Sequence, residues 1–165
     1  MVSFGDITIP VQLMGGFFSV PTCSKGVWQK INQCRTDDDY IGAGKLLLGN
    51  NDLALYDCRL LVAVYIQSME QLREETGLVI PDYPVTPTGK EVKYTVYTQL
   101  DKLAADYANM SLYEIDDIPI IDYWLILRDA FISRLSVTEK GREYLNNAYR
   151  LTQTEADDDI SIGRS

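Results

Sequence analysis

The sequence contains no histidine and only three cysteines, Cys23, Cys34 and Cys58. A serine or cysteine nucleophile needs a neighbouring base, which is most often histidine, so the lack of histidine argues against nucleophilic catalysis. Three cysteines without C-x-x-C spacing indicate neither a disulfide framework nor a zinc site. We therefore expect a protein that is not an enzyme, with no catalytic residues and with no cofactor or metal bound.

Long apolar runs are also missing. The most apolar stretch is IIDYWLIL at 120–127, which is far shorter than the roughly 20 residues needed to cross a bilayer. The opening segment MVSFGDITIP has no basic region followed by an apolar core, so we expect no signal peptide. The sequence thus predicts synthesis in a reducing cytoplasm and no contact with a membrane.

Basic residues are outnumbered, with 15 Lys and Arg against 24 Asp and Glu and a net charge of −9. Residues 1–50 carry four of each sign, whereas 51–150 carry sixteen acids and ten bases, and 151–165 carry four and one. Proteins hold duplex DNA largely by placing Lys and Arg on its phosphates, so specific DNA binding is not expected. An acidic surface could mimic nucleic acid, or let nucleic acid pass without sticking.

Two local patterns resemble ligand sites without completing them. The GAGK stretch at 42–45 ends like a phosphate-binding loop, but Asp39 and Leu46 occupy the positions that need glycine and Ser or Thr. We interpret it as a flexible turn within a loop. The DDD runs at 37–39 and 157–159 lack the alternate spacing and the glycine of a calcium loop. They indicate solvated charge or salt bridges to a basic partner.

A further group of acidic residues could in principle form acid–base pairs. Asp117 is better explained as a helix cap, and Asp116 by the dipole at a helix N-terminus. The group consists of Glu114, Asp116, Asp117 and Asp122.

Apolar periodicity predicts a mainly α protein, a bundle of about four helices with extended N- and C-terminal arms. The helical core is expected at 51–151. Its expected helices are 52–76, 95–109, 118–135 and a last one opened by a capping box at Ser136. We expect the first and third of these to form the central pair, and their buried residues to include Leu60, Val64, Trp124 and Phe131.

Residues 1–50 are expected to form an N-terminal arm with one short helix. Ile7, Ile9, Val11 and Leu13 alternate with other residues, which predicts a strand or an extended arm. Ser24 is expected to cap the short helix, and the stretch that follows it, through the GAGK sequence, is expected to be a loop. The Pro- and Gly-rich segment 77–90 could form a small β-hairpin with 91–97.

The stretch IIDYWLILRDAFISRLSVTEKGREYLNNAYRLTQTEADDD at 120–159 resembles the small helical neck proteins of tailed bacteriophages, particularly the ring proteins of crAss-like phages. The likeness covers about a quarter of the chain and carries no diagnostic motif. It implies a non-enzymatic virion structural protein, synthesised in the bacterial host cytoplasm, that forms a head–tail connector ring below the portal. In that family the ring is a dodecamer, its subunits also contact the portal and other neck or tail proteins, and DNA passes through it without specific binding.

Two other classes fit the same composition. One is a small acidic cytoplasmic inhibitor that mimics DNA to block a nuclease, and the other is a regulatory protein-binding module. Mimicry requires carboxylates spaced like phosphates, whereas bases are interspersed with the acids here, for instance in REYLNNAYR at 142–150. This interspersion favours the structural interpretation.

The C-terminal stretch TQTEADDDISIGRS, 152–165, is expected to be an extended acidic arm. Ordering a backbone costs about 1–2 kcal/mol per residue, whereas burying each of its two isoleucines supplies only about 1.5–3 kcal/mol. The arm is therefore expected to lie along another protein chain, with the isoleucines in an apolar groove and the aspartates near Lys or Arg. The residues expected to bind partners are Ile7, Ile9, Val11, Asp157, Asp158, Asp159, Ile160 and Ile162.

Overall fold

The computed structural model describes residues 7–49, 52–80 and 98–149, and these are mainly helical, as the sequence predicts. By internal contacts the chain divides into two units, residues 1–128 and 129–165. The first unit holds two strands, β1 (Thr8–Leu13) and β2 (Gly16–Pro21), and helices α1 (Lys25–Asn32), α2 (Asp37–Leu48), α3 (Leu55–Glu75) and α4 (Gln99–Ala108). A 3-10 turn, η2 (Glu114–Asp116), and helix α5 (Ile120–Ser136) follow, then a helix over 139–149.

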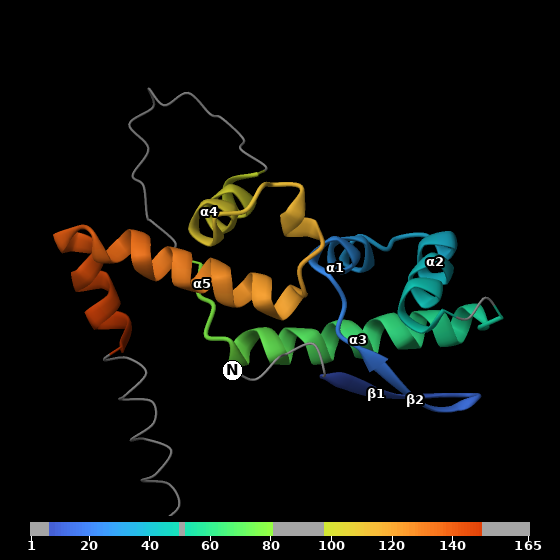
Figure 1. Cartoon of the computed structure of the whole chain (residues 1–165). Helices are drawn as coiled ribbons and strands as arrows, with labels where there is room; N and C mark the ends of the chain where they lie inside the picture. The colour runs from blue at the N-terminus through green and yellow to red at the C-terminus, as the bar shows by residue number, and fades with distance from the viewer. Residues whose placement is uncertain (1–6, 50–51, 81–97, 150–165) are drawn as a thin grey trace, which may run out of the picture. The chain divides into compact units, whose positions relative to one another are not determined.

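The N-terminal residues form a β-hairpin that belongs to the body of the protein. β1 pairs antiparallel with β2, and Thr22 N–H donates to Ile7 O at 3.1 Å just beyond the paired strands. The predicted strand is confirmed, but its interpretation as an arm is wrong for this part of the chain. Ile9 and Val11 are buried, because this face of the hairpin packs on α3 (Figure 1).

The proposed hairpin at 77–97 falls mostly on residues 81–97, which lie outside the described part of the chain.

Helix α1 begins where predicted. The Ser24 side chain accepts from the backbone of Val27 at 3.5 Å, as expected of an N-cap. Trp28 and Ile31 are buried on the inner face of this helix.

The expected loop after α1 is instead helix α2. Thr36 and Asp39 form a capping box, in which each side chain accepts from the other residue's backbone N–H. Three aspartates in the first turn of α2 also suit the positive end of the helix dipole. The GAGK stretch is therefore helical, and its Gly44 lies against Cys58 of α3.

The helical face of α3 is shifted by one residue from the prediction. Leu61, Tyr65 and Met69 are fully buried, whereas Leu60 and Val64 are half-buried. Helix α3 has α2 on one side and the hairpin on another (Figure 1), and these two neighbours together decide which face is covered.

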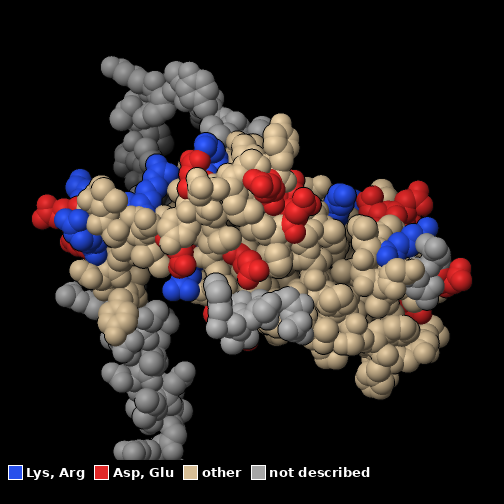
Figure 2. Space-filling model, viewed as in Figure 1, with Lys and Arg blue, Asp and Glu red and all other residues tan. Residues whose placement is uncertain are grey.

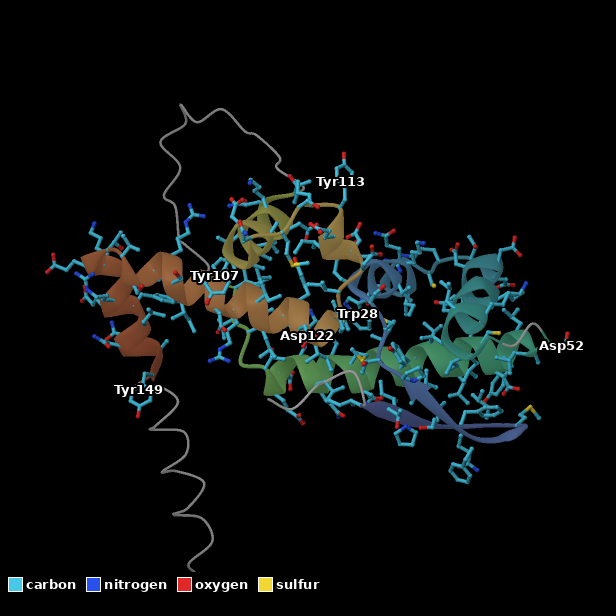
Figure 3. The ribbon with its side chains drawn as sticks, viewed as in Figure 1. Trp28, Asp52, Tyr107, Tyr113, Asp122 and Tyr149 are labelled. Carbon is cyan, nitrogen blue, oxygen red and sulfur yellow. The ribbon has the colours of Figure 1, made fainter. Side chains whose placement is uncertain are left out.

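The predicted central pair of long helices corresponds to α3 and α5. In the structure these two helices are linked by aromatic contacts through Trp28 of α1. Trp28 lies 6.4 Å from Tyr65 of α3 and 5.8 Å from Trp124 of α5, measured between ring centroids. Figure 3 labels Trp28 at this position. Trp124 is buried as predicted.

The second unit contains the end of α5 and the helix at 139–149. The last helix was predicted to be capped by Ser136, and this prediction is wrong by two residues. Thr138 Oγ1 accepts from Gly141 N–H at 3.0 Å, whereas Ser136 Oγ donates to Ser133 O. Phe131, expected to be buried, is half-buried. A side chain at position 141 would place its Cβ 2.0 Å from the Leu135 carbonyl oxygen, so the turn requires glycine.

Candidate interaction surfaces

The most concentrated group of charges surrounds Lys25. Its ammonium group donates to Asp101 at 2.8 Å and Asp116 at 2.7 Å, and Tyr123 OH donates to the second oxygen of Asp101 at 2.7 Å. Lys25 is 3% exposed. Burial acts to lower the pKa of Lys25, but the hydrogen bonds and charges of the two aspartates together raise it. The cluster therefore holds α1, α4, η2 and α5 together, with the lysine kept charged.

The cysteines have the properties of core residues. Cys34 and Cys58 are buried and Cys23 is half-buried, and burial raises the pKa of all three thiols. A thiol must ionise to act as a nucleophile or metal ligand, so these environments oppose both roles. Within the described ranges no group of His, Cys, Asp and Glu is arranged to hold a metal ion.

Several acidic side chains accept hydrogen bonds from nearby backbone N–H groups. Asp39 accepts from the backbone of Arg35 and Thr36, and these bonds lower the pKa of its carboxyl. Glu114 accepts from the backbone and hydroxyl of Ser111, which lowers its pKa likewise. With Asp116 paired to Lys25, two of the four residues considered for acid–base chemistry, Glu114 and Asp116, are engaged in local structure instead.

The predicted partner-binding residues have different positions. Ile9 and Val11 are buried within their own chain and Ile7 is half-buried, so the expectation that they bind a partner is wrong for the first two. The physical reason is that β2 and α3 already cover them. Asp157, Asp158, Asp159, Ile160 and Ile162 lie outside the described residues.

The tip of the hairpin is the apolar surface that sequence reasoning missed. Met14, in the turn, and Phe17, the second residue of β2, are 83% and 80% exposed. Neither strand carries a charged side chain, and in Figure 2 the hairpin region is tan. The GGFF sequence at 15–18 was the available signal, because adjacent residues of a strand point to opposite faces, so one of the two phenylalanines must face away from the core.

The edges of this hairpin are poor templates for a further strand. Because Ile7 and Thr22 form a hydrogen-bonded pair, alternation places Pro10 and Pro21 at positions whose backbone faces outward. Proline has no N–H to offer a neighbouring strand. Contacts through the side chains of Met14 and Phe17 are thus favoured over strand addition.

A third exposed apolar position lies in the second unit. Val137 is 77% exposed in the turn that links α5 to the helix at 139–149. In the first unit, Tyr113 is also exposed and points away from the neighbouring helices (Figure 3).

Three surface hollows are lined by residues of α1, α2, α3 and the segments beside them. One, of about 410 Å³, is lined by Arg35, Tyr40, Arg59, Val62, Ala63 and Ile66. The second lies between α1 and α2, where Lys30 and Lys45 face Asp38 and Asp39. The third places Lys30 near Asp116 and Asp117. The hollow that contains Arg35 and Arg59 therefore differs from the other two, because its lining includes no acidic residue.

Comparison of the chain with protein-family models, with curated proteins and with solved structures found no match. Among the described residues, no helix has the length and apolar character needed to cross a membrane.

Proposed function

We propose that this protein is a non-enzymatic virion structural protein, a subunit of a head–tail connector ring that surrounds a DNA channel below the portal. The observation that carries the proposal is the exposure of large apolar side chains in both units. Met14 and Phe17 lie in one unit, and Val137 lies in the other. A closed ring is built from a heterologous interface, in which each subunit uses two different surfaces.

The resemblance of 120–159 to phage neck proteins supports the same proposal, and the charge distribution suits it. An acidic ring repels the DNA that threads through it, so the DNA can slide. Acidic and basic side chains are interspersed in Figure 2. Several carboxylates also form ion pairs within the chain, as Asp37 does with Arg59 and Asp106 with Lys102. Both features weaken the alternative of a DNA mimic, which needs unpartnered carboxylates in phosphate-like order.

Light scattering on the full-length protein and electron microscopy of purified particles test the proposal. We expect a discrete oligomer, or assembly once the portal is present, and a ring below the portal in the particles. The double variant Met14→Ser/Phe17→Ser should lose assembly while remaining folded. Tyr113→Ser is the matched control, because it also replaces an exposed aromatic side chain. A monomer in solution that is also absent from purified particles contradicts the proposal.

A further inference from the structure

The hollow lined by Arg35, Tyr40, Arg59, Val62, Ala63 and Ile66 is called here the arginine groove. Its apolar residues are neighbours on one stretch of α3, and Tyr40 comes from α2. The Arg59 guanidinium lies 5.6 Å from the centre of the Tyr40 ring. The groove therefore combines an apolar floor with a cationic rim in a chain that is acidic overall.

Both arginines retain donors for a further ligand. Arg35 donates from one terminal nitrogen to the carbonyl oxygens of Cys34, at 2.8 Å, and Asn32, at 3.4 Å. Arg59 donates to Asp37 through one nitrogen, and its side chain is 56% exposed. A guanidinium carries five N–H donors, so each of these groups can bind an additional carboxylate.

We infer that the arginine groove binds the acidic C-terminal segment 157–162 of a second copy of this chain. The segment reads DDDISI, so it supplies carboxylates for Arg35 and Arg59, then two isoleucines for the apolar floor. Ile160 and Ile162 are two residues apart, so in an extended strand they face the same side. Arg59 and Ile66 are both on α3, about 10 Å apart along the helix, so six extended residues, which span about 20 Å, can reach from one to the other.

The second copy, rather than the same chain, follows from the proposed ring, on which this inference rests. In a closed heterologous ring every subunit gives one segment and receives one. The other two hollows fit the segment less well. Asp37 partly neutralises Arg59, but it does not line the arginine groove, whereas Asp38 and Asp39 line one of the other hollows, and Asp116 and Asp117 line the second, where they would repel the aspartates of the segment.

Cysteine cross-linking between full-length chains tests the inference. One batch carries Ala63→Cys in the arginine groove, and the other carries Ser161→Cys between the two isoleucines. After mixing and mild oxidation, we expect a disulfide-linked dimer containing one chain of each kind. The matched control replaces Ala63→Cys by Gly42→Cys, which lines the α1–α2 hollow and has open space around its Cβ. This control should give at least tenfold less cross-linked dimer.

Charge reversal identifies the ionic part of the contact. Adding Arg35→Glu and Arg59→Glu to the Ala63→Cys chain should lower the cross-link yield at least tenfold. Asp157→Lys and Asp158→Lys in the Ser161→Cys chain should restore it. Lys30→Glu with Lys45→Glu makes the same charge change in the other hollow and should leave the yield unchanged. The milder pair Arg35→Gln and Arg59→Gln should lower the yield in a chain whose circular dichroism is unaltered.

The outcomes separate this inference from the proposed function. Absence of the mixed dimer overturns the inference. The inference also fails if a chain that carries both Ala63→Cys and Ser161→Cys forms the disulfide only within itself. If the ring assembles without this cross-link, the inference fails and the connector proposal stands. If the dimer forms but the protein is absent from particles, the inference stands and the connector proposal fails.

Discussion

At the scale of single residues, the two indoles in contact, Trp28 and Trp124, carry the largest expected energetic effect. Trp124 is 4% exposed and meets Trp28 edge to face. Trp124→Ala should lower the free energy of unfolding by about 3–5 kcal/mol, because it removes a large buried side chain and leaves a cavity. Urea unfolding followed by circular dichroism measures the loss. Trp124→Phe should cost clearly less, and equal losses for the two variants would contradict this account.

A second residue-scale prediction concerns the buried lysine. Lys25→Met leaves Asp101 and Asp116 side by side without their cation, and should destabilise the protein by about 3 kcal/mol. This is the lower end of the range for breaking a buried pair, since the Asp116 side chain is 56% exposed. The exposed pair of Lys102 and Asp106 provides the control, and Lys102→Met should cost less than about 1 kcal/mol. Urea midpoints for both variants decide the matter.

At the scale of elements, glycine decides how two helices meet. Gly141→Ala would place a methyl group 2.0 Å from the Leu135 carbonyl oxygen, so the turn between α5 and the helix at 139–149 must open. We expect faster amide exchange over that helix and a lower melting temperature for the second unit. Gly42→Ala is the control, since its Cβ meets open space in α2, and should stabilise by about 0.4–1 kcal/mol. Unchanged exchange in Gly141→Ala would show that the turn adapts without opening.

At the scale of the whole molecule, the buried titratable groups predict sensitivity to alkali. Burial raises the pKa of Tyr65 and of Tyr123, and the pKa values of Lys25 and the three thiols are raised too. The folded state therefore binds these protons more tightly than the unfolded state. Their stabilisation is complete below about pH 8, begins to be lost as the pH passes the ordinary values, from about 8.5 to 10.4, and keeps falling until the pH has passed the raised values of the folded state.

The urea concentration at the midpoint of unfolding should accordingly decrease as the pH is raised from about 7.5 to about 10. Tyr123→Phe should reduce the size of this fall, because one of the titrating groups is removed. A midpoint that is constant or rising over this interval would contradict the assignment of these groups as buried and protonated.

The whole assembly supplies the remaining prediction. Deleting 152–165 should leave the fold intact, since the described helices and the hairpin lie outside that segment. It should abolish incorporation into particles, because the segment is expected to contact a neighbouring chain. Unchanged circular dichroism together with loss from purified particles is the expected result. A truncated chain that assembles normally would refute the role given to the arm.

The sequence alone determined the features that depend on near neighbours. Ser24 as a cap and the alternation of β1 are local effects of side chains on their own backbone. The absence of histidine and of metal-like spacing also needed no structure. Apolar periodicity along the chain predicted the mainly α class, and the absence of histidine led to the expectation that the protein is not an enzyme.

Which faces and segments meet depends on packing between parts of the chain that lie far apart in sequence. The phase of α3 depends on two neighbours, α2 and the hairpin, that periodicity within α3 cannot reveal. The burial of Lys25 depends on Asp101 and Asp116, which lie 76 and 91 residues away in the chain. The arginine groove likewise joins Arg35, in the connection between α1 and α2, to Arg59 on α3. Such contacts arise from packing between distant segments, because burial is settled by what covers a residue and not by its sequence neighbours.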